Sequence, residues 1–181
     1  GNVLRNLESY YSRVADILTN YDRAIDPVLV DFINDPDIGD RARRLVIDVA
    51  AARNIQSAVP AILSLVKKTS NDEIRIGALK ALAVFEDPAA EPFLRTQLSS
   101  PNWVLRSQAI RALAKTGSGT TPEAAEYMLL HDDHYLVRLY SARALAELGP
   151  AGKERLQSLL NGRPDDETAQ ILRDVVTTET V

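Results

Sequence analysis

The sequence predicts an all-α, right-handed solenoid of about five helical hairpins, forming a single domain over residues 1–181. Three observations support this fold class. Four arginines recur at steps of 32, 31 and 32 residues, namely Arg43, Arg75, Arg106 and Arg138. Each arginine opens a similar phrase with apolar residues at helical spacing, as in Ile74–Leu82 and Leu105–Leu113. Short turn segments rich in Gly, Pro, Asn and Asp separate these phrases. A fixed period of this length is typical of repeat arrays, and short connections favour antiparallel hairpins.

Eleven helices and no strand are expected along the chain. A long first helix precedes a second that begins after Asp26-Pro27 and runs to about residue 34. The remaining expected ranges are 39–53, 56–68, 72–86, 88–99, 102–116, 122–131, 134–148, 150–161 and 166–177. The first helix is expected over about 3–21. Proline starts the second helix of each pair, at Pro27, Pro60, Pro92, Pro122 and Pro150. Proline is tolerated there because the first-turn amides have no intrahelical partner.

The repeated phrase Val/Ile/Leu-Arg-x-x-Ala-x-x-Ala-Leu, followed by a turn and Ala-x-Pro-x-Leu, resembles the HEAT-like repeat. The short bacterial variety, also found in phycobilin lyases, is the most similar. The resemblance covers residues 25–162 and is strongest in the repeats that start near 72, 102 and 134. Residues 1–24 and 163–181 fall outside it and are expected to form capping helices, which a solenoid needs at its ends. The resemblance implies a HEAT-like solenoid that binds another protein.

On a helical wheel the four arginines lie inside the apolar stripe of their helices. A guanidinium keeps its charge, so a buried one needs partners. We expect a ladder of Arg-to-Asp and Arg-to-carbonyl bonds that links each repeat to its neighbour. The expected side-chain partners stand just upstream of the arginines: Asp40, Asp72, Asn102, and Asp132 or Asp133. Losing one ladder arginine, as in Arg106→Ala, is expected to destabilise the fold by about 1–3 kcal/mol.

The fifth position after each arginine lies on the solvent side of the helix. It holds Asp48, Lys80, Arg111 and Arg143. This basic ridge is interpreted as a solvated face, and alternatively as a contact line for an acidic partner.

Composition excludes several function classes. The chain has no cysteine, which removes disulfides, thiolate metal sites and cysteine nucleophiles. Residues 37–160 carry 16 basic and 14 acidic side chains, which is not the basic stripe of a nucleic-acid-binding protein. No apolar run approaches the roughly 18 residues of a membrane span. We expect a cytoplasmic protein, for which any membrane contact would require a further segment ahead of Gly1.

Three local features are interpreted as structural. His131-Asp132-Asp133-His134 has metal-ligand residue types, but its aspartates are explained as turn, ladder and helix-capping residues. The segment 117–121 is glycine-rich without the lysine of a P-loop and is expected to be a linker between repeats. Trp103, the only tryptophan, is expected at the edge of the core. No catalytic residue, metal or cofactor is therefore predicted.

The first helix has apolar residues on more than one stripe. They are Leu4, Leu7, Tyr10, Tyr11, Val14, Ile17, Leu18 and Tyr21. We interpret the helix as a cap packed on the next hairpin, with a dimer or partner seam as the alternative.

The function expected from these observations is a non-enzymatic scaffold or adaptor. The second helices would form a curved, concave surface that presents polar side chains to a partner protein. The candidate contacts are Gln56, Lys67, Arg95, Gln97, Tyr127 and Arg155. Two alternatives stay open: a bilin lyase or chromophore chaperone, tested by visible absorbance with a bilin, and a nucleic-acid-binding protein, tested by gel shift at low salt.

Overall fold

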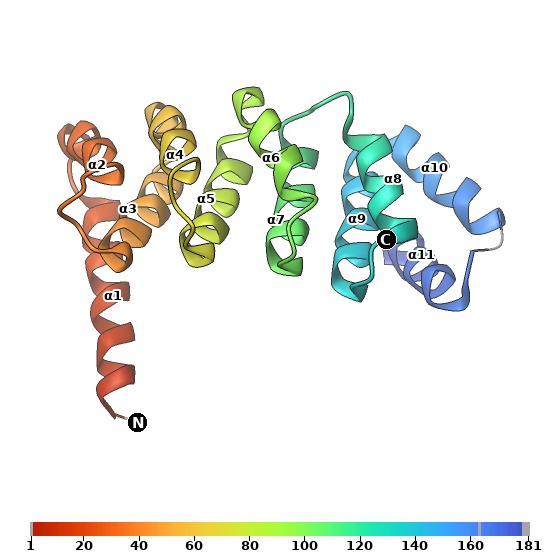
Figure 1. Ribbon diagram of the computed structural model, residues 1–181, viewed down its shortest axis with the longest axis horizontal. Helices are drawn as coiled ribbons and strands as arrows, with labels where there is room; N and C mark the ends of the chain where they lie inside the picture. Colours follow the sequence, from red (N-terminus) through yellow and green to blue (C-terminus); the bar gives the residue numbers. More distant parts are fainter. Residues whose placement is uncertain (1, 163, 179–181) are drawn as a thin grey trace. The chain divides into compact units, whose positions relative to one another are not determined.

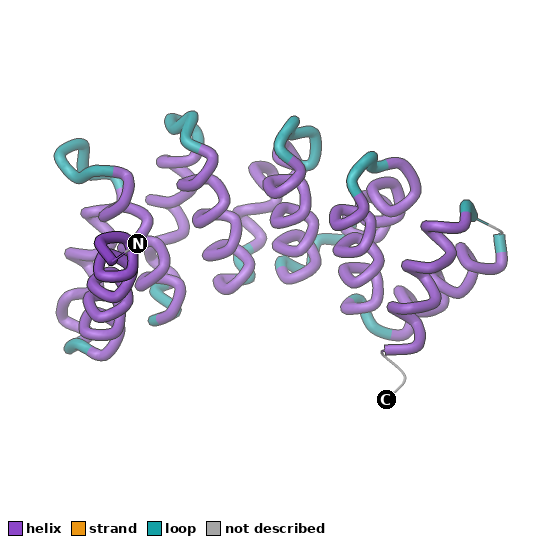
Figure 2. The backbone as a smooth tube through the Cα atoms, turned by 90° about the horizontal axis from the view of Figure 1, so that it is seen from below, coloured by secondary structure: helices purple, strands orange, loops and turns teal. Residues whose placement is uncertain are grey.

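The predicted all-α solenoid is confirmed. The structure is a computed structural model that describes residues 2–162 and 164–178, with the side chains of 2–9 and 178 outside the description. Eleven α-helices, three short 3-10 helices and no strand occupy these residues (Figure 1). The α-helices are α1 (Asn2–Asn20), α2 (Asp26–Ile33), α3 (Asp40–Ala52), α4 (Val59–Val66), α5 (Asp72–Phe85), α6 (Glu91–Gln97), α7 (Trp103–Lys115), α8 (Thr121–His131), α9 (Tyr135–Glu147), α10 (Pro150–Asn161) and α11 (Asp166–Thr178). Short loops connect them (Figure 2).

Two second helices are shorter than the sequence pattern predicts. Instead of single helices over 56–68 and 88–99, 3-10 turns at Gln56–Ala58 and Pro88–Ala90 lead into α4 and α6. Pro60 and Pro92 lie in the first turn of these α-helices. Because proline has no amide to donate, it suits the first turn of an α-helix, and the chain ahead of it takes the tighter 3-10 form.

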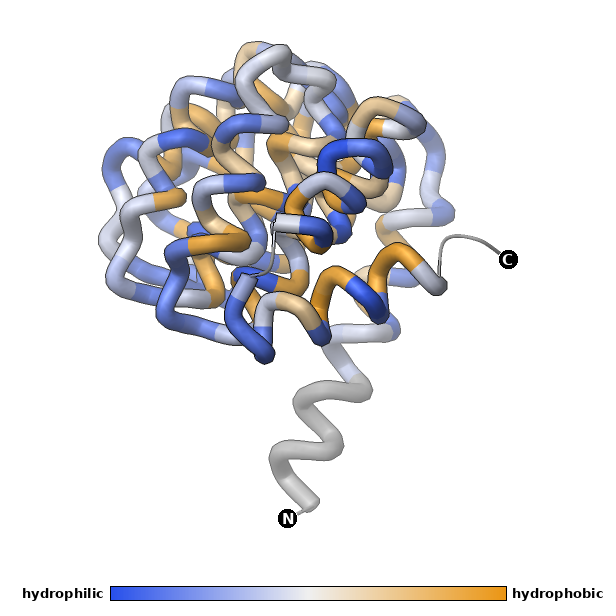
Figure 3. The backbone as a smooth tube through the Cα atoms, turned by 90° about the vertical axis from the view of Figure 1, so that its right-hand side faces the viewer, coloured by the Kyte–Doolittle hydropathy of each residue, from blue (hydrophilic) through white to orange (hydrophobic). Residues whose placement is uncertain are grey.

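The chain forms two compact units, residues 1–85 and 86–181. In the first, α3 packs against α1, α2 and α5, and α4 packs against α2 and α5. In the second, α9 packs against α7, α8, α10 and α11, and α7 also contacts α6 and α8. Apolar and polar residues alternate along the helices, as the hydropathy colours of Figure 3 show. The single-domain organisation stays a prediction.

Each core consists of aliphatic residues from the inner faces of the hairpins. The largest fully buried side chains are Ile33, Ile47, Ile62, Ile74, Leu79 and Leu82 in the first unit, and Leu94, Leu105, Ile110, Leu113, Leu129 and Leu145 in the second. Helices α9 and α10 approach closely at Gly152, where an added Cβ would lie 1.8 Å from the carbonyl oxygen of Leu145. A glycine at this position therefore sets the distance between the two helices.

A left-handed residue follows the first helix of four successive hairpins. The φ angles are 53° at Asn54, 55° at Glu86, 67° at Gly117 and 80° at Gly149. These residues stand 11 positions after the four ladder arginines and keep their steps of 32, 31 and 32. A left-handed residue after a helix lets the chain reverse direction at the helix end. The repeat therefore includes a left-handed backbone position that only its two glycines, Gly117 and Gly149, indicate clearly in the sequence.

The ladder arginines tie the start of each first helix to the loop before it. Arg43 donates from Nε to the Ile33 carbonyl at 3.0 Å, and Arg75 from Nε to the Thr69 carbonyl at 3.1 Å. Arg106 donates from Nη1 to the Ser100 carbonyl at 2.9 Å. These carbonyls lie at or just beyond the end of the preceding second helix. Such terminal carbonyls lack intrahelical donors, and the guanidinium satisfies them.

The acidic partners of the arginines differ from the expected upstream residues at two positions. Arg43 lies 2.9 Å from Asp40 and Arg75 lies 3.7 Å from Asp72, each within one helix. Arg106 instead binds Asp132 and Asp133 in the next repeat, and Arg138 binds Glu167. The reason is local: Asn102 accepts the Val104 amide as the N-cap of α7, and Asp132 turns toward α7 from the loop after α8.

Candidate functional site

A groove between α6 and α8 brings two of the predicted contact residues together. Its volume is about 590 Å³. The lining residues are Arg95, Leu98, Ser99, Thr120, Glu123, Ala124, Tyr127 and Met128. Tyr127 projects at the wall with 65% of its surface exposed, whereas Met128 is buried in the floor. The groove therefore joins an apolar floor to a polar rim, and it lies between two second helices, α6 and α8.

A chain of hydrogen bonds shapes the α6 side of the rim. Arg95 donates from Nη1 to the hydroxyl of Thr120 at 2.7 Å, and that hydroxyl donates to Glu91 at 2.9 Å. Hydrogen bonds from Ser118 and Thr120 lower the pKa of Glu91, against the opposing effect of burial. The glycine-rich linker after α7 thus holds an ionised carboxylate and fixes the position of Arg95.

Arg155 of α10 is paired with two glutamates of α8. It binds Glu126 and lies 3.2 Å from Glu123, which lines the groove. The hydrogen bond that Arg155 donates to Glu126 is the main cause that raises the pKa of Arg155, so the guanidinium stays charged. Because its charge is already neutralised by carboxylates, this arginine is poorly placed to bind a nucleic-acid phosphate.

The other predicted contacts lie apart from the groove. Gln97 follows on α6 and donates to the Thr96 hydroxyl at 3.0 Å. In the unit of residues 1–85, Lys67 is exposed after α4. Gln56 donates to Asn54 at 2.9 Å and to the Phe85 carbonyl at 3.3 Å, so its amide supports the end of α5.

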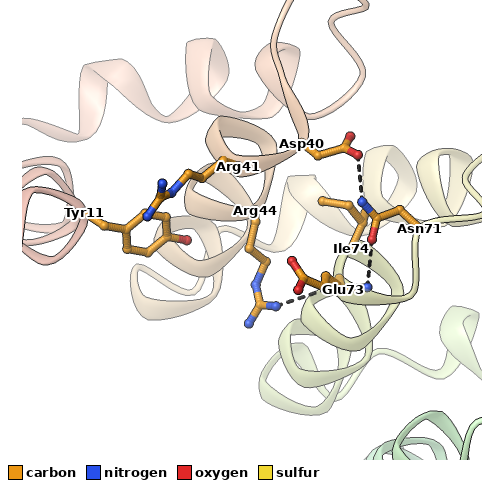
Figure 4. A pocket seen from close by; sticks show the side chains of 7 residues that line it. All are labelled: Tyr11, Asp40, Arg41, Arg44, Asn71, Glu73 and Ile74. Atoms are coloured by element: carbon orange, nitrogen blue, oxygen red, sulfur yellow. Dashed lines mark hydrogen bonds between the residues drawn. The ribbon is translucent and has the colours of Figure 1, made fainter. Parts of the chain in front are cut away.

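Sequence reasoning missed a second groove, in the unit of residues 1–85. Figure 4 shows it among α1, α3 and α5, with a volume of about 650 Å³. It is lined by Tyr11, Asp40, Arg41, Arg44, Asn71, Glu73 and Ile74. Most of its polar groups already bind one another: Arg44 donates to the Glu73 carbonyl at 3.1 Å, and Asn71 donates to Asp40 at 2.7 Å. Hydrogen bonds within this groove therefore hold α3 to the start of α5.

The cluster at 131–134 is built into the fold. Arg106 donates to both oxygens of Asp132, at 2.7 and 2.8 Å. His134 accepts the Leu136 amide through Nδ1 as the N-cap of α9, and its ring stacks on Trp103 with 4.0 Å between centroids. The N-cap of α9 is therefore His134 rather than the expected aspartate. Among the residues that the structure describes, no three metal-ligating side chains lie together.

Lys80 in the first unit and Arg111 and Arg143 in the second are each exposed, as the helical wheel indicates. Arg111 and Arg143 lie over the Tyr140 ring, at 5.0 and 5.9 Å from its centre. Asp48 is half-buried and accepts hydrogen bonds from Tyr11 and Arg44. Over residues 2–162 and 164–178, no helix has the length and apolar character that would carry it through a bilayer.

Comparisons with known proteins agree with this architecture. Residues 26–114 and 59–129 match the family described as HEAT repeats. The crystal structure of an engineered protein is similar over 94% of this chain and 88% of that chain, with a TM-score of 0.55 and 21% sequence identity. At this identity the likeness concerns the fold alone. The search of curated proteins gave no match.

Proposed function

The chain belongs to the HEAT-repeat family, and from this premise we propose that it is a non-enzymatic scaffold that holds a segment of a partner protein in the α6–α8 groove. Repeat arrays of this kind provide surfaces for protein interaction. The observation that carries the proposal is the exposed Tyr127 beside an open, apolar-floored groove. The choice of partner class rests on the family and on this groove together.

The groove has the properties of a binding hot spot. Tyrosine is enriched among the interface residues that dominate binding energy, because one side chain provides a large apolar ring and a hydroxyl. The volume of about 590 Å³ accommodates a few side chains of a peptide segment. An apolar anchor of the partner would contact Tyr127 and the floor at Leu98 and Met128.

The rim adds charge selectivity. Arg95 on α6 and Glu123 on α8 both line the groove and carry opposite charges. Thr120 holds Arg95, and Arg155 holds Glu123, so little side-chain entropy is lost when a ligand binds. We therefore expect the partner segment to carry an apolar anchor flanked by groups of both signs, rather than a uniformly acidic or basic run.

A displayed-peptide selection tests the proposal. The wild-type protein is immobilised, and enriched peptides are then measured on Tyr127→Ala and on Tyr135→Ala. Tyr135 is a matched control because it is an exposed tyrosine at the start of α9, outside the groove residues. We expect peptides with an apolar anchor to lose binding on Tyr127→Ala and to keep it on Tyr135→Ala. Peptides that bind both variants as well as the wild type would contradict the choice of groove.

A further inference from the structure

Over residues 10–21, the described apolar side chains of α1 and its end fall on two stripes, and only one of these stripes is covered. Tyr11, Ala15 and Leu18 are partly buried on the side that packs against α3. The other stripe, called here the α1 seam, consists of Tyr10, Val14, Ile17 and Tyr21. These side chains are 71%, 39%, 62% and 59% exposed. Three of these side chains lie on α1, and Tyr21 directly follows its last residue; together they form a contiguous apolar surface.

The spacing of the α1 seam is that of a helix–helix interface. Its members follow one another at steps of four, three and four residues. This is the alternation of the a and d positions of a coiled coil, in which one helix packs its side chains between those of another. Leu7 and Val3 continue the spacing in the sequence, although their side chains lie outside the described part.

The other terminal helix shows what a solvent-facing cap looks like in this chain. Helix α11 buries Ile171, Leu172 and Val175 against its own unit. Its exposed positions include Gln170, Arg173 and Asp174, all polar. A polar outer face is what keeps the terminal repeat of a solenoid soluble. By comparison with α11, the apolar α1 seam is typical of a helix face that packs against another helix.

Helix α1 is held firmly enough to present the seam. Arg53 donates from Nη1 to the carbonyls of Leu18, Thr19 and Tyr21, at 2.8–2.9 Å, and its Nε donates to Asp26. In Figure 1, α1 extends past the other helices of its unit. A preorganised helix loses little entropy when it associates.

We propose that the α1 seam joins two copies of this chain, with α1 of one copy packed along α1 of the other. The exposed side chains of the seam offer roughly 500 Å² per copy, against about 800 Å² per partner in a standard interface, and adjoining residues of α1 add the rest. The seam contains no charged residue. On the side of the seam that faces away from α3, the neighbouring described residues are Arg13 and Asn20, and only Arg13 is charged. Two identical seams therefore meet without burying a charge.

A second copy fits this seam better than a different helix. Flanking charges are what select one coiled-coil partner over another, and this seam has almost none. The same apolar patch on both copies is self-complementary, as a two-fold symmetric interface requires. The proposal is independent of the α6–α8 groove, which lies in the other unit.

Dilution experiments on the whole chain test the dimer. Sedimentation or light scattering over a concentration series should show a dimer that dissociates on dilution. Ile17→Glu should weaken the dimer at least tenfold, because it places a charge in the seam. Val84→Glu is the matched control, since Val84 is exposed on α5 of the same unit and lies outside the seam. A wild type that is monomeric throughout, or an Ile17→Glu variant that dimerises like the wild type, overturns the proposal.

Cysteine cross-linking provides a second measurement if Ile17→Glu fails to fold. The chain has no cysteine, so an introduced thiol reports one contact. Under mild oxidation, Val14→Cys alone should form a covalent dimer if the helices are parallel, and a mixture of Tyr10→Cys with Val14→Cys if they are antiparallel. Ser12→Cys, on the opposite side of α1, is the control. Cross-linking no greater than this control in both cases contradicts the pairing.

Discussion

Arg106→Ala gives a severe test of how the repeats are held together. In the wild type the guanidinium binds both oxygens of Asp132, one oxygen of Asp133 and the Ser100 carbonyl. The side chains of Arg106 and Asp132 are 12% and 4% exposed, whereas that of Asp133 is 89% exposed. The substitution therefore leaves a buried carboxylate without its cation, while the loss of the exposed Asp133 pair costs little.

The expected loss of stability is about 3 kcal/mol. Removing one partner of a buried ion pair costs about 3–5 kcal/mol, because the other charge stays buried without compensation. Asp132 keeps the hydrogen bond from the His134 amide at 2.9 Å, which places the loss at the lower end of that range. Arg75→Ala is the matched control at the same repeat position. There the two side chains are 32% and 44% exposed and 3.7 Å apart, so we expect about 1 kcal/mol.

The loss should depend on pH in a definite direction. Burial disfavours the charged form of Asp132, but hydrogen bonds from Arg106 and the His134 amide outweigh it and keep the pKa below its ordinary value. This stabilisation is complete above the unfolded pKa and is lost as the pH falls through the folded pKa. In Arg106→Ala the effect of burial should dominate and raise the pKa of Asp132. Protonation of Asp132 as the pH falls then removes the buried charge and restores part of the variant's stability. The difference between the two proteins should shrink from about pH 7 towards about pH 4.

Urea denaturation followed by circular dichroism and by Trp103 fluorescence measures this difference. Trp103 is the only tryptophan and stacks on His134, two residues from Asp132. A difference below 1 kcal/mol, or one of constant size between the two pH values, would refute the assignment of Asp132 as the buried partner.

Three further predictions follow from the fold. Gly117→Ala should lower the free energy of unfolding by about 1–2 kcal/mol because φ is +67° there, whereas Gly119→Ala should be nearly neutral. An added Cβ meets no atom within 4 Å at either site, so the expected cost is one of backbone conformation alone. Equal urea midpoints for the two variants would contradict it. Arg53→Ala should cost about 3 kcal/mol and expose residues 20–25 to limited proteolysis, because it removes the donor to two carbonyls at the end of α1 and to the Tyr21 carbonyl after it. Proteolytic resistance equal to the wild type would refute that role. Burial and the neighbouring Asp48 raise the pKa of Tyr11 to about 12. The stability that this shift contributes is present below about pH 10 and should be lost as the pH rises towards 12. In alkaline denaturation curves, Tyr11→Phe should show a smaller loss than the wild type.

The sequence predicts the helices well because their signals are local. Apolar spacing, proline at the start of second helices and glycine or asparagine in the turns are all visible within one repeat. The left-handed residues at Asn54 and Glu86 were not predicted, since neither residue type requires that conformation. The backbone there adopts it because the chain reverses direction into the next helix within a few residues.

The contacts between repeats could be predicted in kind but not in detail. An arginine inside an apolar stripe needs acceptors, but the sequence does not say which ones. Arg75 pairs with Asp72 in its own helix, whereas Arg106 pairs with Asp132 in the next repeat, because the loop after α8 brings Asp132 close to it. The same limit applies to the site. Arg95 and Tyr127 were expected on the second helices, whereas Thr120 and the floor at Met128 depend on how α6 and α8 are spaced. Arg53 was missed because its carbonyl partners lie more than 30 residues away.

Calorimetric titration of a selected peptide into three proteins tests the proposed binding groove most directly. The proteins are the wild type, Tyr127→Ala and Tyr135→Ala. Truncating a central aromatic contact costs about 2 kcal/mol or more, so Tyr127→Ala should weaken the affinity more than tenfold, with Tyr135→Ala equal to the wild type. Equal affinities for all three proteins would show that the α6–α8 groove is not where the partner binds.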